Sequence, residues 1–220
     1  MSAPSPGPGA AGLPPAYWAH CYGDRASMDG VGNARDHVAY LASLLRLERI
    51  PVHRVLDVGF GTGDLLLAVA RRLHPAEVVG LEPSPTAWSQ RPTQWPHDVG
   101  VALYPTDALS WLGRADQRHQ RFDLVLWLSV AQYMADDELY EVASALADRA
   151  RLLYFTAPTD RDYVKMAATG FRDPWAVARA ATQYRRLVGA SFRRVGYRVW
   201  ESRRVAPASS PFEDLDGSAG

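Results

Sequence analysis

Residues 55–64 read VLDVGFGTGD, an apolar run with one acid that leads directly into three glycines at alternate positions. The run Arg54–Val58 has the composition of a buried strand, and Asp64–Leu73 continues with apolar residues at helical spacing. Glycines let the backbone turn sharply and let a ligand approach it without meeting a Cβ atom. The stretch therefore predicts a strand, a tight glycine turn and a helix, with a ligand site at the turn.

The same alternation of short apolar runs and helical patterns continues along the chain. Further strands are expected at residues 77–81, 99–104, 123–128, 151–156 and 197–205, and helices at 16–22, 34–47, 85–90, 108–112, 136–149 and 175–195. Strands that alternate with helices form βαβ units. We therefore expect an α/β fold, a doubly wound, mostly parallel Rossmann-like sheet of six to seven strands with helices on both faces. A seventh strand would require a hairpin within residues 192–205.

The composition of the chain argues against several classes of function. With 24 basic and 24 acidic residues among 220, the formal net charge is zero, which disfavours a nucleic-acid partner bound through its phosphates. No apolar run approaches the ~18 residues that span a membrane, and no secretory signal is recognised. The single cysteine, Cys21, cannot form an internal disulfide, so we expect a cytoplasmic protein. The histidines show no paired spacing, so no metal site is expected, and nothing indicates the oligomeric state.

The two ends of the chain differ in composition from its middle. Residues 1–15 and 206–220 are rich in Pro, Gly, Ala and Ser, which bury too little apolar surface to offset the entropy of ordering. Both segments are therefore predicted to be flexible tails. Residues 16–205 contain no linker-like break and are expected to form one domain.

Several features resemble the class I S-adenosylmethionine-dependent methyltransferases. The G-x-G-x-G spacing after Asp57 is similar to motif I of this family and differs from the G-x-G-x-x-G of dinucleotide-binding proteins. Phe122–Tyr133, a strong strand and the segment after it, is similar to motif IV. The resemblance covers residues 17–205 and is most specific between residues 54 and 133. It implies S-adenosylmethionine (SAM) as the cofactor and a small-molecule substrate.

The resemblance also implies roles for individual residues. Glu82, before Pro83, stands where the family has an acid that accepts both ribose hydroxyls, and a carboxylate offers two acceptor oxygens to such a diol. Asp107 and Ala108 stand where the family binds the adenine amino group and ring, although Asp107 could instead cap a helix. The candidate cofactor-binding residues are Tyr22, Asn33, Arg35, Asp57, Gly59, Phe60, Gly61, Gly63, Glu82, Pro83, Asp107, Ala108 and Leu128.

Residues 16–50 precede the first strand and are similar to the lid of small methyltransferases that act on metabolites. The aromatic rings of Tyr17, Trp18 and Tyr22 could face the sulfonium, a cation–π contact of about 2 kcal/mol when desolvated. They could equally pack the first helix onto the sheet. Asn33 and Arg35 could hold the amino-acid end of the cofactor.

Methyl transfer is an in-line displacement, so its catalysis rests mostly on proximity, alignment and exclusion of water. The position at motif IV where a general base is often found holds Ser129, Gln132 and Tyr133 instead of a His, Asp or Glu. The candidates for orienting the nucleophile or the sulfonium are Tyr17, Ser129, Gln132, Tyr133 and Tyr163. Because the cofactor-binding sheet and the lid take up most of the chain, we expect a small metabolite as acceptor, in bacterial secondary metabolism.

Two alternatives remain open from the sequence. Some class I members use SAM as their sole substrate and cyclise it to azetidine-2-carboxylate, releasing methylthioadenosine, and the short chain without an obvious base fits that reaction too. A non-catalytic SAM-binding module is the second alternative.

Overall fold

In the computed structural model, residues 8–9, 12–22, 28–205 and 210–212 are described, and they contain a seven-stranded sheet in the order β3-β2-β1-β4-β5-β7-β6. The strands are β1 (Arg54–Val58), β2 (Glu77–Leu81), β3 (Gly100–Tyr104), β4 (Phe122–Leu128), β5 (Ala150–Thr156), β6 (Phe192–Arg194) and β7 (Val199–Ser202). The first five are parallel, whereas β7 runs antiparallel to both β5 and β6. The predicted doubly wound, mostly parallel sheet is confirmed.

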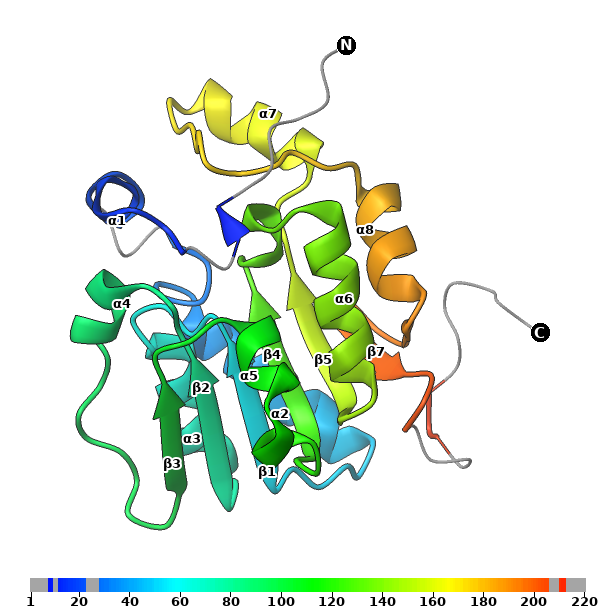
Figure 1. Cartoon of the computed structure of the whole chain (residues 1–220). Coiled ribbons are helices and arrows are strands. Elements are labelled where there is room, and N and C mark those ends of the chain that lie inside the picture. The colour runs from blue at the N-terminus through cyan, green and yellow to red at the C-terminus, as the bar shows by residue number, and fades with distance from the viewer. Residues whose placement is uncertain (1–7, 10–11, 23–27, 206–209, 213–220) are drawn as a thin grey trace.

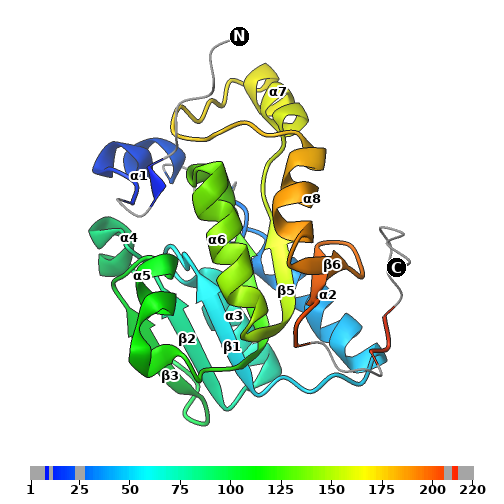
Figure 2. The same cartoon turned by 45° about the vertical axis from the view of Figure 1, so that its right-hand side comes forward.

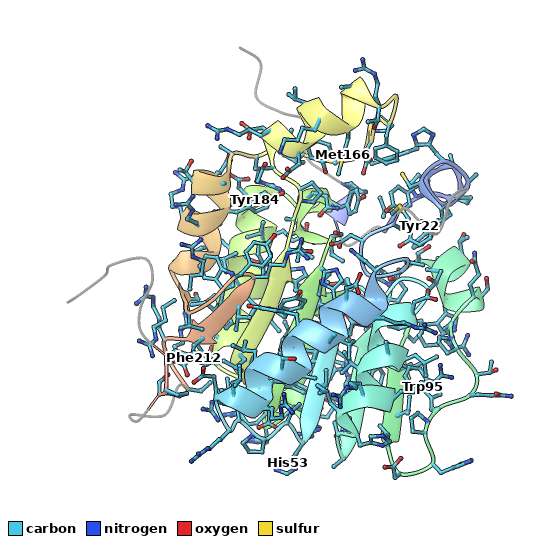
Figure 3. All side chains as sticks on the ribbon, turned by 180° about the vertical axis from the view of Figure 1, so that it is seen from behind. Tyr22, His53, Trp95, Met166, Tyr184 and Phe212 are labelled. Atoms are coloured by element: carbon cyan, nitrogen blue, oxygen red, sulfur yellow. The ribbon has the colours of Figure 1, made fainter. Side chains whose placement is uncertain are left out.

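Side chains of β4 alternate between the two faces of the sheet, as a strand's period of two requires. Leu124, Leu126 and Leu128 pack with α2 (Ala34–Leu47) and α3 (Asp64–Leu73). Val125 and Trp127 point the other way, into the core shared with α5 (Ala108–Gly113), α6 (Asp136–Ala147) and α8 (Ala181–Gly189). The sheet is thus covered by helices on both faces, α5, α6 and α8 in front in Figure 1 and α2 and α3 in front in the reverse view of Figure 3.

Three further helices lie at the carboxyl ends of the parallel strands. These are α1 (Pro15–Cys21), α4 (Pro85–Ser89) and α7 (Asp160–Ala168), seen at the upper end of the sheet in Figures 1 and 2. A separate apolar cluster joins α1 to α4 and to the segment after β4 through the buried residues Tyr17, Trp18, Cys21, Ala87 and Tyr133. Ligands of open α/β sheets bind beyond this edge, near the point where the strand order reverses, here between β1 and β4.

The segment predicted as a lid, residues 16–50, divides into two parts. Helix α1 lies at the strand ends, as a lid would. Helix α2 instead packs its buried Val38, Leu41 and Leu45 on the sheet, so it belongs to the core. Its apolar face covers the strands and cannot also close over their ends. Residues 23–27 of the predicted lid lie outside the described residues.

The predicted helix at residues 175–195 is wrong at both ends. The helix observed there, α8, runs only from Ala181 to Gly189, and Phe192 already belongs to β6. The chain then turns through Gly196 and Arg198, with Val195 N–H donating to Val199 O at 2.9 Å. Residues 192 and 195 are apolar and happen to continue the helical spacing. A three-residue strand is too short to show the alternating pattern that would have distinguished it from a helix. The hairpin supplies the seventh strand.

The predicted tails lie mostly outside the described residues: residues 1–7, 10–11, 206–209 and 213–220 are not described. Of the parts that are, Leu13 packs beside α1, and Phe212 packs against the core on the α2 face. In the described part of the chain, no helix combines the length and apolar character that crossing a membrane needs.

Candidate active site

The glycine turn after β1 needs glycine at each of its three positions. Gly59, Gly61 and Gly63 all have positive φ, at 73°, 58° and 81°, in the left-handed region that other residues adopt at a cost. A Cβ atom at position 59 would lie 2.6 Å from Val130 Cγ2, and one at position 63 would lie 2.6 Å from Pro92 Cδ. The turn is tied to β2 by Gly59 N–H, which donates to Leu81 O at 2.8 Å. The predicted strand, turn and helix are confirmed.

Two buried carboxyl groups face this turn. Glu82 Oε2 accepts a hydrogen bond from Gly61 N–H, and Oε1 accepts one from Ser84 N–H, both at 2.8 Å. Burial raises the pKa of Glu82 to about 7 despite these bonds. Burial and the neighbouring charge of Glu82 raise the pKa of Asp57 to about 8. Two acids held in a position this unfavourable for their charge are typical of a functional site.

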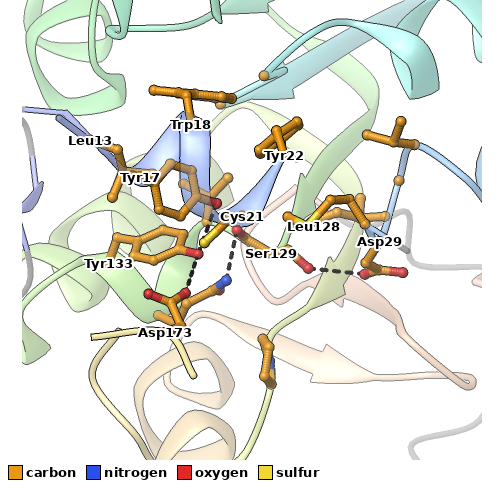
Figure 4. Close-up of a pocket in the computed structure, with 18 of the residues that line it drawn as sticks. Leu13, Tyr17, Trp18, Cys21, Tyr22, Asp29, Leu128, Ser129, Tyr133 and Asp173 are labelled. Carbon is orange, nitrogen blue, oxygen red and sulfur yellow. Dashed lines mark hydrogen bonds between the residues drawn. The ribbon is translucent and has the colours of Figure 1, made fainter. Parts of the chain in front are cut away.

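The turn and the two acids form one wall of a cavity of about 400 Å³, which lies in the range of small-molecule sites. Its other walls come from α1, from the segment after β4 and from the loop that follows α7 (Figure 4). The described residues that line it include Asp29, Asp57, Asp64, Glu82 and Asp173, and no Lys, Arg or His. This pocket, called the acid-lined pocket below, is therefore suited to a ligand that carries positive charge.

A chain of hydroxyl groups crosses this pocket to a carboxylate. Tyr133 Oη donates to Asp173 Oδ2 at 2.7 Å, so Tyr17 Oη, 3.0 Å away, donates its own hydrogen to Tyr133 (Figure 4). Burial raises the pKa of both tyrosines far above its ordinary value, so both stay protonated near neutral pH. Tyr17 and Tyr133 can therefore donate hydrogen bonds but cannot serve as bases, and the acceptor at the end of the chain is Asp173.

The 3-10 turn η4 (Ala131–Tyr133), which presents Tyr133 and Gln132, is held in place by Arg179. The buried guanidinium donates to Ala131 O at 3.1 Å and to Met134 O at 2.5 Å, and pairs with Asp136 at 2.7 Å. A planar group with five donors satisfies several acceptors in one fixed geometry. The position of Tyr133 is thus set by a residue far along the chain.

Three side chains that line the acid-lined pocket have a buried polar atom without a hydrogen-bond partner among the described residues. The atoms are Trp18 Nε1, Gln132 Oε1 and Tyr163 Oη. The amide of Gln132 is oriented by its other end, because Nε2 donates to Ser129 O at 2.9 Å. Buried polar atoms are nearly always paired in folded proteins, so these three are candidates to bind a ligand.

Asp29 is the centre of a polar network at the edge of the pocket. Its Oδ1 accepts from Asn33 Nδ2 at 2.9 Å and lies 2.8 Å from His37 Nε2. Its Oδ2 accepts from Ser129 Oγ and Thr156 Oγ1, both at 3.0 Å. Burial alone would raise the pKa of Asp29, but hydrogen bonds from His37, Asn33 and Ser129 outweigh it and lower the pKa well below its usual range. The network therefore keeps Asp29 charged.

Most of the residues predicted from the sequence line the acid-lined pocket. They are Tyr17, Tyr22, Asp57, Gly59, Phe60, Gly61, Glu82, Pro83, Leu128, Ser129, Gln132, Tyr133 and Tyr163. Sequence reasoning missed Asp29 and Asp173 as site residues. Asp29 was visible only as one acid in the predicted lid, and Asp173 lies in a loop with no motif.

Five predicted cofactor residues are not in the wall of this pocket. Gly63 caps the start of α3 instead, and Asp107 caps α5, with Oδ1 accepting from Ser110 N–H at 2.8 Å. Ala108, the first residue of α5, is buried in the core between this helix and the sheet. Asn33 holds Asp29 and lines a neighbouring cavity, and Arg35 is exposed on α2 because it points away from the sheet.

Sequence comparison points to one family. A family model described as "Methyltransferase domain" matches residues 55–152, which is somewhat less than half of the chain. A release factor glutamine methyltransferase of Geobacter sulfurreducens is 39% identical over 74 residues, 33% of this chain and 24% of the relative. The chain thus matches about a quarter of the length of this curated relative.

Solved structures share the fold at low sequence identity. The magnesium protoporphyrin IX methyltransferase ChlM of Synechocystis PCC 6803, with bound S-adenosylhomocysteine (SAH), has a TM-score of 0.55 and 18% identity and covers 85% of this chain and 96% of its own. The plantazolicin methyltransferase BpumL, also with SAH, has a TM-score of 0.57 and 13% identity over 72% of this chain and 64% of its own. The N-methyltransferase NodS of Bradyrhizobium japonicum WM9 has a TM-score of 0.54 and 18% identity over 77% and 88%.

The matched residues 55–152 run from β1 into β5 and include the glycine turn, Glu82 and the segment after β4. Around them the sheet has the order β3-β2-β1-β4-β5-β7-β6, with β7 reversed beside β5. Residues 55–152 are thus similar to a methyltransferase domain, and the described chain shares its fold with solved methyltransferases.

Proposed function

We propose that this chain binds SAM in the acid-lined pocket and transfers the methyl group to a small molecule. The observation that carries the proposal is the position of Glu82, whose two oxygens face the glycine turn and are each held by one backbone N–H. Each carboxylate oxygen retains acceptor capacity for a ribose hydroxyl. A Cβ atom at Gly61 would lie 3.1 Å from Tyr22 Oη, closer than ordinary van der Waals contact, so glycine keeps this part of the wall open.

The charge of the pocket supports the same ligand. SAM supplies a methyl group on a positively charged sulfur, and its amino group is a second cation. The charged acids of the described wall attract both cations, Asp29 above all because its network keeps it ionised, and no described basic residue opposes them. The rings of Tyr17, Trp18 and Tyr22 pack together with centroids 4.5–6.0 Å apart and give the wall aromatic faces that also favour cations.

The residues of the pocket would position the acceptor and take its proton. An amine or hydroxyl acceptor loses a proton when its nitrogen or oxygen bonds to the methyl carbon. The carboxylate of Asp173 would receive that proton, and Tyr133, which donates to the same carboxylate at 2.7 Å, would hold it in place. Gln132 and Tyr163, with unpaired buried oxygens, would bind polar groups of the acceptor. Closure of α1 over the strand ends would exclude water.

A small acceptor fits both the site and the relatives. The pocket has a volume of about 400 Å³, and the solved methyltransferases of the same fold include enzymes named for plantazolicin and magnesium protoporphyrin IX. On this basis we propose a metabolite as acceptor and a role in bacterial secondary metabolism.

The proposal is tested by incubating the full chain with SAM and following the products by mass spectrometry. We expect stable SAM in the protein alone and SAH when an acceptor from a panel of small amines and phenols is added. Methylthioadenosine with azetidine-2-carboxylate, formed without an acceptor, would instead establish cyclisation. Binding without turnover of any panel member would favour a non-catalytic module, and no measurable SAM binding would refute the proposal outright.

A further inference from the structure

A second cavity, of about 670 Å³, adjoins the acid-lined pocket beside the carboxyl end of β5. The two cavities share the wall residues Asp29, Ser129, Pro158 and Met166. Most of the remaining wall comes from the end of β5, from α7, from the start of α8 and from the β6–β7 hairpin, on the α7–α8 side of Figure 2. The cavities are therefore neighbouring compartments with Asp29 and Ser129 at their boundary.

The charge of this second cavity is opposite to that of its neighbour. Its described cationic residues are Lys165, Arg185, Arg194 and Arg198, against two acids, Asp29 and Asp162. Both acids are already engaged within the protein. Asp162 closes the capping box of α7, and Asp29 accepts the hydrogen bonds of its own network. The surplus of positive charge therefore acts on whatever enters the cavity.

Two of these cations are placed in ways that suit a ligand. Arg198 has φ 65°, a left-handed conformation that a residue other than glycine keeps only where its surroundings enforce it. Its peptide carbonyl accepts from Phe155 N–H at 2.8 Å, and its Nη1 lies 3.3 Å from His37 Nδ1, so the guanidinium is fixed at the inner wall. Arg185 is exposed in the middle of α8, and its side chain has no hydrogen bond or ion pair with the described residues.

The apolar part of the wall gives the cavity a second property. Phe155, Tyr184 and Trp200 line it and are each less than 8% exposed, so their rings are fixed by the core behind them. A cavity with rigid aromatic rings on one side and guanidinium groups on the other matches a molecule with an apolar body and an anionic end.

We propose that the second cavity binds an anionic group of the methyl acceptor, a carboxylate or a phosphate, while the acceptor's nucleophile reaches past Ser129 into the acid-lined pocket. This inference rests on the proposed function and names the substrate class for the same site. Planar guanidinium groups bind both oxyanions through paired hydrogen bonds. The acceptor is thus a small molecule that carries a nucleophile at one end and an oxyanion at the other.

The test uses the full chain saturated with SAH and titrated by calorimetry with succinate, inorganic phosphate and the neutral succinamide. We expect the two anions to bind and succinamide not to bind. Arg185→Gln should weaken anion binding about tenfold, the usual effect of losing one charged hydrogen bond. Arg186→Gln changes the next residue of the same helix, outside the cavity, and should leave binding unchanged. Arg198→Gln, with a thermal melt to verify folding, probes the inner wall.

Three results would overturn the proposal: no binding of either anion, equal binding of succinamide, or the same effect from Arg185→Gln and Arg186→Gln. The cofactor's own carboxylate is the other source of an anionic group. If Arg185→Gln and Arg198→Gln weaken SAM itself about tenfold, the cavity holds the cofactor's amino-acid end and the proposal is wrong. Binding of SAH in the first step tests the proposed function separately, because it depends on the acid-lined pocket alone.

Discussion

The acid-lined pocket and the cavity beside β5 share part of their walls but differ in the charge of their side chains. The described wall of the first holds five acids and no basic residue, and the wall of the second holds four basic residues. A formal net charge of zero for the whole chain hides this separation entirely. The charge of an individual pocket, and not the net charge of the chain, is therefore informative about the ligand.

The boundary between the two compartments is built around one carboxylate. Asp29 accepts from Ser129 Oγ, which borders both cavities, and from Thr156 Oγ1, which lines only the cavity beside β5. His37 contacts Asp29 through Nε2 and lies 3.3 Å from Arg198 through Nδ1, so the network connects the acid at the boundary to the guanidinium of the second wall. Such a network fixes the position of both groups relative to each other.

The largest effect is expected from a substitution of Asp173, the carboxylate that accepts the hydrogen bond from Tyr133. Asp173→Asn removes the proton acceptor but preserves the shape, and should lower kcat about 100-fold or more, because a positioned base contributes about 10²–10⁴. SAM affinity should stay unchanged, as measured by calorimetry. Asp160→Asn, an exposed acid on α7 outside the pocket, is the matched control. An unaltered kcat in Asp173→Asn would mean that the acceptor loses its proton directly to solvent.

A smaller effect is expected at Gly61, whose backbone forms part of the wall of the acid-lined pocket. Gly61→Val introduces a branched side chain beside Tyr22 Oη, at a position with φ 58°. Overpacking by added methyl groups costs about 1–3 kcal/mol, so SAM affinity should fall about 10–100-fold. Gly113→Ala, at the end of α5 with no atom within 4 Å of the new Cβ, serves as control. Equal affinities for both variants would place the cofactor away from the turn.

A third effect is expected from Glu82, whose protonation should make ligand affinity depend on pH. Glu82→Gln exchanges one acceptor for a donor and should weaken SAM binding about tenfold, the cost of one charged hydrogen bond. Because burial raises the pKa of Glu82 to about 7, the protonated acid dominates at pH 6, whereas ribose hydroxyls favour the carboxylate. The affinity for methylthioadenosine, which lacks the amino-acid arm, should therefore rise between pH 6 and pH 8 in the wild type. The variant should show a smaller rise by calorimetry, because of the two buried acids only Asp57 remains to titrate, and a flat wild-type profile would contradict the ribose assignment.

The sequence predicted those site residues that directly follow a recognisable strand. The glycine turn, Glu82 and the segment after β4 each stand at a strand end that an apolar run marks, and strand ends in a parallel sheet meet at one edge. The hairpin of β6 and β7 could be inferred only as an option, because strands of three and four residues carry too little pattern to compete with helical spacing.

The rest of the site depends on contacts between distant residues. Asp29 and Thr156 are 127 positions apart, and Tyr133 and Asp173 are 40 apart. No spacing rule connects such pairs, since they meet only after the sheet and its connections have formed. The same applies to the cavity beside β5, whose basic residues come from α7, α8 and the hairpin.

The smallest effect is expected for Asp107, which follows β3. Its carboxylate either only caps α5 or also binds the adenine, and the two roles predict different results. Asp107 caps α5, and its loss in Asp107→Ala should lower the free energy of unfolding by about 1 kcal/mol, measured by denaturant titration. Since Asp107 is not in the described wall of the acid-lined pocket, SAM affinity should change less than about threefold, below 1 kcal/mol. Asp107→Asn keeps a capping oxygen and should restore stability. A tenfold loss of affinity in both variants would instead show that the carboxylate accepts a hydrogen bond from the adenine, and the acid-lined pocket would then extend past Pro83 to the end of β3.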